Sequence, residues 1–463
     1  MKNATINLII LGSVLGAVSF FSVDAFIITL LLAACFVYIW LRFPAGDERR
    51  FILSVFSWGI AARLLLIILY YYFFLLPGNT DIIAPDGECY QARGWYISRF
   101  LTGGDMYIIP SSEQIFRDYR DMVSFYAEEI PDWRLYQVGV FSYAIAFLYS
   151  VFDYVPQLIK FINAVFSVAS AIVIYELAKS LFGKKAARIS MIIIAFLPSI
   201  FVFSLTSARD PMVILLLCLS IYSLTKFYLG YSLLHLAVVF FCAGLVYFIR
   251  ISVFAPLMLV LAIALFISLR FRFRWKISFL VLCGLLVFSS GYRQKALSSL
   301  DLATLTNPHI GYINTPGNNY KILPDGYYSG SKDIRKIPPL DLAVAFLKGL
   351  FHSLFEPFPW KLKTKGELFG AVQALAWVMF FPFALIGISF GLKHKLKESH
   401  VAFICVVVFS ALLAIGEGNV GTVFRHRDML MPFFIIFGVA GIFIFFDDKE
   451  LSEIAKNRFP AAK

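Results

Sequence analysis

The sequence predicts an all-α protein, a polytopic bundle of transmembrane helices, and three observations lead to this fold class. Hydrophobic residues make up 60% of the 463 residues. Charged residues make up only 15%, whereas a soluble domain carries about 25%. Apolar stretches of about 18 residues or more recur from end to end, and each is long enough to cross the hydrocarbon core of a bilayer as a helix.

These stretches predict about twelve membrane spans. In chain order they are 6–23, 25–41, 51–76, 157–182, 187–206, 211–229, 232–249, 252–269, 276–291, 367–391, 400–415 and 428–446. Two further segments are ambiguous, because 135–152 is barely long enough to cross and 341–356 is shorter still. In the second segment apolar and polar residues form opposite stripes, which favours a helix lying in the membrane interface. The apolar stripe is Leu342, Phe346, Leu350 and Leu354, and the polar stripe is Lys348, His352 and Glu356.

The positions of Lys and Arg predict which side of the bundle faces the cytoplasm. Positive loops tend to stay cytoplasmic, and the net charge of +12 comes largely from short basic loops. These loops fall on one side only if neither ambiguous segment crosses, which makes both termini cytoplasmic. The loops are Arg42/Arg49/Arg50, Lys184/Lys185/Arg188, Arg270/Arg272/Arg274/Lys276 and Lys393/Lys395/Lys397. Because orientation accounts for the charge, we expect no nucleic acid as a partner.

The same orientation predicts one integral membrane domain, 1–463, with two large loops on the outer side. The first external loop is 77–134 and the second is 292–340. No Walker loop, GxSxG or dinucleotide fingerprint is present, so we expect no nucleotide hydrolysis. The six cysteines are scattered without CxxC spacing, which indicates neither a disulfide framework nor a zinc site. We expect no cofactor, although a carboxylate site for a divalent metal needs no local motif and stays open.

The first candidate site is a short acidic sequence that follows the third span. Segment 77–134 carries ten Asp/Glu and five Arg but no Lys, and Asp86 and Glu88 lie near its start, after Asp81. These carboxylates adjoin the membrane and precede an aromatic-rich stretch suited to the interface. A transfer to a hydroxyl group needs a carboxylate that takes the proton of the acceptor. The residues alone leave open this role, a solvated acidic loop and a helix N-terminus.

The second candidate site is the turn Ser207–Pro211, between two spans on the outer side. Pro at position 211 suits the first turn of a helix and Asp210 suits its N-cap, so a capping role for Asp210 competes with a functional one. Arg209 offers planar, bidentate hydrogen bonding to a phosphate. Arg250 lies between two apolar runs and is a similar candidate, since ionisable residues at membrane depth tend to be functional.

The third candidate site is a polar cluster before the last span. It comprises Glu417, Arg425, His426 and Arg427. A basic cluster on the outer side is not a cytoplasmic anchor, so we expect an anion-binding site. An interfacial anchor that pairs with Asp428 or with acidic lipids is the competing interpretation. His352 and His426 are candidate ligands or acids, but no HExxH or other paired-histidine spacing supports a metal.

Four stretches together resemble one family. They are Asp86-x-Glu88-x-Tyr90-x-Ala92 after a span; Asn163 followed by residues 174–187; Phe196-Leu197-Pro198 with Ser204 and Arg209-Asp210; and Arg425 to Pro432 before the last span. The chain is similar here to the GT-C superfamily of polyprenyl-phosphate-dependent glycosyltransferases, such as protein mannosyltransferases and the aminoarabinose transferases of lipid A. The likeness is good over 51–230 and loose elsewhere. Two extra spans and the Gly87 that splits the usual Asp-Glu pair depart from the family pattern.

The resemblance implies an inverting glycosyltransferase of the bacterial inner membrane with a periplasmic or extracellular active face. Its donor is a sugar on undecaprenyl phosphate, and its acceptor is a lipid, a glycan or a protein. The first outer loop of the family supplies the acidic catalytic residue, which corresponds here to Asp86 or Glu88. The outer arginines are expected to hold the lipid phosphate and to stabilise it as it leaves, which requires no metal. These are Arg209, Arg250, Arg425 and Arg427.

Three other functions are compatible with the spans. A polymerase or ligase of lipid-linked glycans uses similar arginines on a diphosphate. A transporter or lipid-glycan flippase requires charges in mid-span and symmetry between two halves, whereas here the charges gather at one face. A non-catalytic scaffold explains the spans but not the outward Arg425–Arg427 cluster.

Overall fold

The structure is a computed structural model of the chain, and it describes residues 23–75, 83–104, 139–230, 232–267, 309, 318–333, 337–362 and 365–446. Across these residues the regular structure is helical, and the only β-type pairing is an isolated bridge between Asn319 and Asn419. This confirms the all-α class. The structure divides into two compact units, of which the first is Met1–Ile172, Ala195–Leu215 and Phe248–Arg250, and the second is the remainder. The single integral domain with two external loops stays a prediction.

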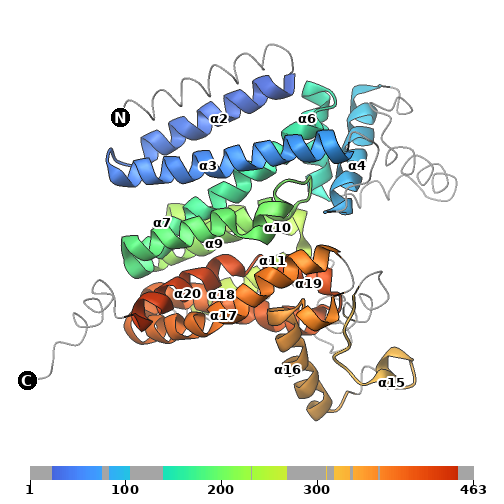
Figure 1. Cartoon of the computed structure of the whole chain (residues 1–463), viewed down its shortest axis with the longest axis vertical. Coiled ribbons are helices and arrows are strands. Elements are labelled where there is room, and N and C mark those ends of the chain that lie inside the picture. Colours follow the sequence, from blue (N-terminus) through green and yellow to red (C-terminus); the bar gives the residue numbers. More distant parts are fainter. Residues whose placement is uncertain are drawn as a thin grey trace, which may run out of the picture. The chain divides into compact units, whose positions relative to one another are not determined.

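The first unit is built from α2, α3, α4, α6, α8 and the start of α7 and α9 (Figure 1). Their bounds are α2 Val23–Arg42, α3 Asp47–Tyr70 with a π-helical turn at Tyr71–Leu75, α4 Pro85–Thr102, α6 Val140–Phe152, α7 Pro156–Phe196, α8 Pro198–Phe203 and α9 Asp210–Gly230. Proline stands in the first turn of α4, α7 and α8, where its missing N–H costs no hydrogen bond. Helices α4 and α6 pack along each other, and a Cβ at Gly94 would come within 2.4 Å of the Ile145 side chain.

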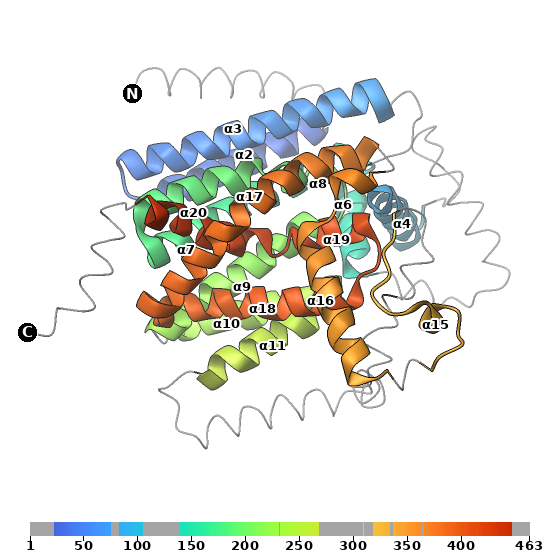
Figure 2. The same cartoon turned by 60° about the horizontal axis from the view of Figure 1, so that its bottom comes forward.

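The second unit contains the rest of α7 and α9, followed by the helices from α10 onward. Their bounds are α10 Leu233–Ile249, α11 Ile251–Ile267, α15 Asp325–Tyr328, α16 Pro339–Phe355, α17 Lys365–His394, α18 Leu396–Gly416, α19 Val420–Arg427 and α20 Met431–Phe445. Figure 2 shows α16 crossing α18, and at this crossing a Cβ on Gly349 would lie 1.8 Å from the Ala414 carbonyl oxygen.

Among the described helices of this unit, α17 and α20 pack against each other most extensively. A Cβ on Gly387 would lie 1.8 Å from the Phe437 carbonyl oxygen, and one on Gly441 would lie 1.8 Å from that of Phe383. Glycines on both helices therefore let the two backbones touch, as small residues do in membrane helix pairs.

The described helices support a polytopic membrane protein. Six of them are long and apolar enough to cross a membrane, and the pair α19 and α20, bent by 63°, makes a seventh if it counts as one span. The expected spans 157–182 and 187–206 coincide with α7, in which Gly183 interrupts the helix at φ 88°, and with the short α8. The expected spans 6–23 and 276–291 lie outside the described residues. The number of twelve spans therefore stays a prediction.

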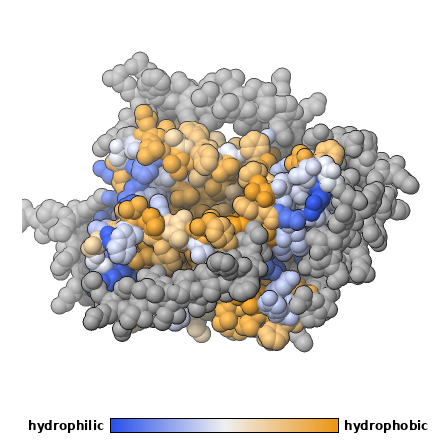
Figure 3. Space-filling view, turned by 90° about the horizontal axis from the view of Figure 1, so that it is seen from above, coloured by the Kyte–Doolittle hydropathy of each residue, from blue (hydrophilic) through white to orange (hydrophobic). Residues whose placement is uncertain are grey.

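The surface agrees with a lipid environment. Figure 3 shows hydrophobic side chains over a broad central band of one face, with hydrophilic ones near two opposite edges. Several large apolar side chains are exposed, among them Trp58 at 70% and Phe73 at 78%. In water such a surface would favour aggregation, whereas in a bilayer it contacts acyl chains.

Candidate functional site

The predicted acidic site is the first turn of α4. The helix begins at Pro85, so Asp86 and Glu88 both lie in its N-terminal turn, Asp86 exposed and Glu88 half-buried. Of the alternatives that the sequence left open, the structure therefore shows a helix N-terminus. The Asp86 carboxylate is exposed there and is accessible to a hydroxyl group. Asp81 and the segment 105–134 lie outside the described residues.

Gly87 explains why the two carboxylates are separated. A Cβ at Gly87 would lie 3.1 Å from the Ala208 amide nitrogen and from the Ser207 carbonyl carbon, so the start of α4 rests directly on that backbone. One turn later, the Gln91 side chain donates a hydrogen bond to the Ser207 hydroxyl. The Tyr149 hydroxyl of α6 donates to the Gln91 amide oxygen at 3.3 Å. The first two candidate sites of the sequence are therefore in contact.

The turn at residues 204–210, on which α4 rests, is held by Asn163 of α7. The Asn163 amide nitrogen donates to the carbonyl oxygens of Thr206 at 2.8 Å and Ala208 at 2.7 Å. All three residues are buried. A single side-chain amide thus fixes the path of a turn that lies 43 and 45 residues away in the sequence.

Arg63, a residue that the sequence analysis did not select, holds the same turn from α3. Its Nε donates to the Ser204 hydroxyl at 2.8 Å, and its Nη2 donates to the Ser167 hydroxyl at 2.9 Å and to the Ala195 carbonyl at 2.8 Å. Its Nη1 donates to the Gly59 carbonyl at 3.0 Å, and its guanidinium lies 4.3 Å from the centre of the Phe201 ring. The signal was an arginine within the apolar run 51–76, which marks a constrained position.

The structure assigns different environments to Arg209 and Arg250. Arg250 and Asp210 form a buried ion pair, so both side chains are committed to each other. Helix α9 begins at Asp210, so the sequence located this helix start, although it predicted Asp210 as the N-cap residue just before the helix. Arg209 is half-buried; it donates through Nη1 to the Ile249 carbonyl at 3.0 Å, and its guanidinium lies 5.5 Å from the centre of the Tyr90 ring on α4. Arg209 therefore lies beside the helix whose first turn carries the carboxylates.

The second unit contains a separate polar cluster around Glu417 and His426. The His426 Nδ1 pairs with the Glu417 carboxylate, and the Glu417 backbone oxygen contacts the His309 Nδ1. The His309 Nε2 lies 3.0 Å from the Tyr328 hydroxyl. The side chains of His309, His426 and Glu417 are buried. His309 was not selected from the sequence, since a lone histidine in a loop carries no distinctive signal.

The polar stripe of α16 belongs to the same cluster. Glu356 is buried; one of its carboxylate oxygens contacts the His352 Nδ1 at 2.8 Å, and the other accepts from the Phe358 N–H at 2.9 Å. The His352 ring stacks on Tyr320, with the ring centres 4.2 Å apart and the planes 4° from parallel. Lys348 of the same stripe is exposed, whereas His352 is half-buried and Glu356 is buried, so the C-terminal end of the stripe faces the protein. The location of this helix in the membrane interface stays a prediction.

Arg427 is fully inside the second unit. It is 1% exposed, and its Nη1 donates to the carbonyl oxygens of Leu354 at 2.7 Å and Glu356 at 2.8 Å, at the end of α16. The guanidinium therefore satisfies two carbonyls at a helix C-terminus, which have no partner within the helix. Arg425 is half-buried on the same helix, α19. Of the two arginines, Arg425 is the one with access to solvent.

Burial determines the charge state of the aromatic groups in this cluster. Loss of solvation raises the pKa of Tyr320 and, against the opposing effect of the Glu417 carbonyl and carboxylate, lowers the pKa of His309. Both groups are therefore neutral at neutral pH and act as hydrogen-bonding partners. No set of three or more metal-ligating side chains comes together within the described part of the chain.

The fold and site define a polytopic membrane protein whose acidic helix terminus is seated on an arginine-bearing turn. The model of the dolichyl-phosphate-mannose-protein mannosyltransferase family matches residues 139–292. This region is thus a domain of a GT-C glycosyltransferase family, which confirms the resemblance and the expectation of an enzyme. The matched region includes Asn163, the turn 204–210 and Arg250, whereas Asp86 precedes it. No curated protein and no solved structure matches the chain.

Proposed function

We propose that this protein is an inverting glycosyltransferase that moves a sugar from a polyprenyl phosphate to a lipid, glycan or protein acceptor. The reaction would take place at the non-cytoplasmic face of a bacterial inner membrane. The observation that carries the proposal is the seating of the acidic first turn of α4 on the Ser207–Ala208 backbone, beside Arg209. The family domain at 139–292 supplies the class of donor, a sugar on a lipid phosphate.

The proposed chemistry is a single displacement at the anomeric carbon. The acceptor hydroxyl oxygen forms the new glycosidic bond while the bond between the anomeric carbon and the phosphate oxygen breaks. Asp86 takes the hydroxyl proton as general base, since its carboxylate is exposed in the first turn of α4. Glu88, half-buried in the same turn, is the alternate base or a partner that orients the acceptor.

The leaving group is the lipid phosphate, which gains negative charge as the bond breaks. Arg209 is the arginine of the first unit proposed to match that charge, because its planar guanidinium suits a phosphate and its neighbour Tyr90 restricts it. Arg250 contributes by fixing Asp210, the first residue of α9, through their ion pair. In this assignment Arg250 positions the turn, and Arg209 contacts the donor.

Within the second unit, Arg425 is proposed to bind an anion, since it is half-buried and keeps access to solvent. The Glu417–His426 pair fixes the helix that carries it, and Arg427 ties that helix to the end of α16. His352 stacks on Tyr320 and is proposed to hold the shape of this region.

Mass spectrometry of lipid-linked sugars and surface glycans tests this function. Cells would express wild type, Asp86→Asn, Glu88→Gln or no protein at matched levels. The matched control is Asp153→Asn, which removes an exposed carboxylate of the same unit that pairs with Arg99.

We expect a polyprenyl-phosphate sugar to accumulate, and one glycan modification to disappear, in cells with Asp86→Asn and in cells without the protein. The control should resemble wild type. Wild-type glycans in both Asp86→Asn and Glu88→Gln would refute the carboxylate mechanism. Accumulation of a lipid-linked oligosaccharide rather than a single sugar would instead indicate a polymerase or ligase.

A further inference from the structure

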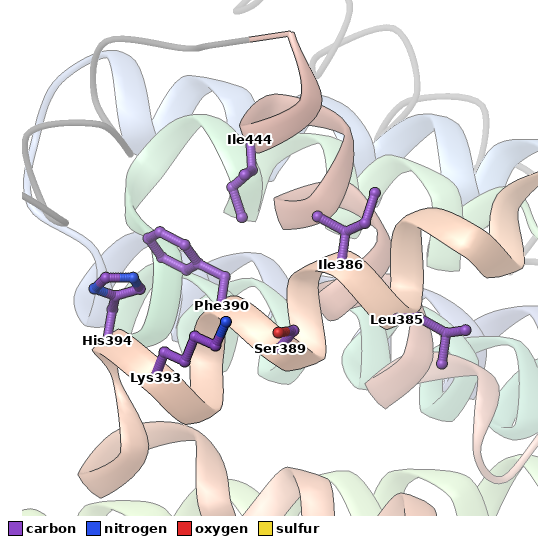
Figure 4. Close-up of a pocket in the computed structure, with 7 residues that line it drawn as sticks. All are labelled: Leu385, Ile386, Ser389, Phe390, Lys393, His394 and Ile444. Atoms are coloured by element: carbon purple, nitrogen blue, oxygen red, sulfur yellow. The ribbon is translucent and has the colours of Figure 1, made fainter.

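The second unit carries an open groove at the C-terminal end of α17. The groove has a volume of about 460 Å³ and is lined by seven residues (Figure 4). They are Leu385, Ile386, Ser389, Phe390, Lys393 and His394 of α17 and Ile444 of α20. The groove shares no residue with the first turn of α4 or with the Glu417–His426 cluster, so neither site accounts for it.

The groove is apolar at one end and basic at the other. Leu385, Ile386 and Ile444 form the apolar end. Lys393 stands eight residues after Leu385, which corresponds to about 12 Å along a helix. Figure 4 shows the Lys393 side chain extended along α17 with its ammonium group directed toward Ser389. The His394 ring packs on Phe390 with ring centres 4.6 Å apart, which closes the basic end.

The charges around the basic end favour an anion. Lys395 and Lys397 follow Lys393 within four residues, where α17 ends and α18 begins. The C-terminus of a helix by itself disfavours an anion, so the attraction must come from the lysine side chains. Lys393 is the lysine that lines the groove, and it is therefore the decisive one.

We propose that this groove binds an anionic phospholipid of the surrounding membrane. An acyl chain lies between Ile386 and Ile444, and the headgroup phosphate meets the Lys393 ammonium and the Ser389 hydroxyl. Lysines near a membrane surface attract anionic lipids, and a long apolar wall next to a cation fits an amphipathic ligand better than a free ion. This site is independent of the proposed transfer reaction, since it shares no residue with it.

Native mass spectrometry of the purified full-length chain tests the proposal. The detergent solution is supplemented with phosphatidylglycerol, with phosphatidylcholine of the same acyl chains, or with inorganic phosphate as a competitor. The variants are Lys393→Gln and, as matched control, Lys397→Gln, which removes an exposed lysine of the same basic end that does not line the groove. A third variant, Ser389→Leu, adds an apolar side chain where the phosphate is expected.

We expect wild type to retain phosphatidylglycerol over phosphatidylcholine. Lys393→Gln should weaken that retention about fivefold, the effect of one lysine near an anionic surface. Ser389→Leu should also weaken it, while Lys397→Gln should not. An equal loss of phosphatidylglycerol retention in Lys393→Gln and Lys397→Gln would mean that general surface charge holds the lipid, and would overturn the proposed site. Equal retention of both lipids, or displacement by inorganic phosphate, would overturn the lipid as the ligand.

Discussion

The replacement Asn163→Asp tests whether one buried amide positions the turn on which α4 rests. Aspartate has nearly the shape of asparagine, but the ionised carboxylate has no N–H to donate. The Thr206 and Ala208 carbonyl oxygens would each lose a donor and face a carboxylate oxygen instead. Because the side chain and both carbonyls are buried, water does not replace the lost bonds.

The expected loss follows from the two hydrogen bonds. A buried polar group left without its partner costs about 1–3 kcal/mol, so two carbonyls give about 2–6 kcal/mol of local stability. If the turn opens more often by that amount, amide exchange there becomes about 30- to 20,000-fold faster, since about 1.4 kcal/mol is a factor of ten. The Leu205 N–H, which donates to the Val202 carbonyl at 3.0 Å, reports on this opening.

The assay is hydrogen–deuterium exchange of the detergent-solubilised protein, with sugar transfer measured on the same sample. The matched control is Ser170→Ala on the same helix, α7, because the Ser170 hydroxyl donates to the Phe166 carbonyl of its own helix at 2.9 Å. Donor binding should weaken in Asn163→Asp and not in the control. Unchanged exchange at Leu205 in Asn163→Asp would refute the reasoning, as would an equal effect of Ser170→Ala.

Three further predictions concern close approaches and a buried base. Gly87→Ala should destabilise the contact of α4 with the turn by about 1–3 kcal/mol and lower transfer, whereas Gly139→Ala, whose Cβ meets nothing nearer than 4.0 Å, should do neither. Gly441→Ala should lower the melting temperature far more than Gly244→Ala, which adds a methyl group in open space. Burial lowers the pKa of His309, so its neutral form stabilises the fold above about pH 6.5. That stability is lost as the pH falls below this value, because the unfolded chain takes up the proton first. The difference in melting temperature between wild type and His309→Gln should therefore change over this pH range. A difference that does not depend on pH would contradict the assignment.

The sequence predicted elements better than it predicted their orientation. The start of α9 at Asp210 followed from Asp-Pro, because proline fits the first turn of a helix and aspartate fits its terminus. The helix at Pro339–Phe355 followed from its periodicity. Which of its residues are buried did not follow, since Leu354 of the apolar stripe and Glu356 of the polar stripe are both buried.

The candidate site was predictable in part. Asp86, Glu88 and Arg209 were selected because charge beside an apolar run is rare, and the structure brings the two stretches together through Gly87. Arg427 was selected for the same reason, yet it satisfies the carbonyls that end α16. An arginine can bind the free carbonyl oxygens at a helix end or the oxygens of a phosphate through the same hydrogen bonds. The sequence does not distinguish these two partners.

By itself the sequence determined that this chain is a helical membrane protein. In the hydrocarbon core of a bilayer, the backbone N–H and C=O groups of a long apolar run have no water to bond. Only a helix pairs these groups with one another within a single segment. It also determined the local helix starts, which depend on neighbours in the chain. Only the tertiary structure decided that Asn163 reaches Thr206 and Ala208, and that Gly87 lies on Ser207. Spacing along one helix fixes neighbours three and four residues apart, whereas contacts between helices depend on the shapes of the faces that meet.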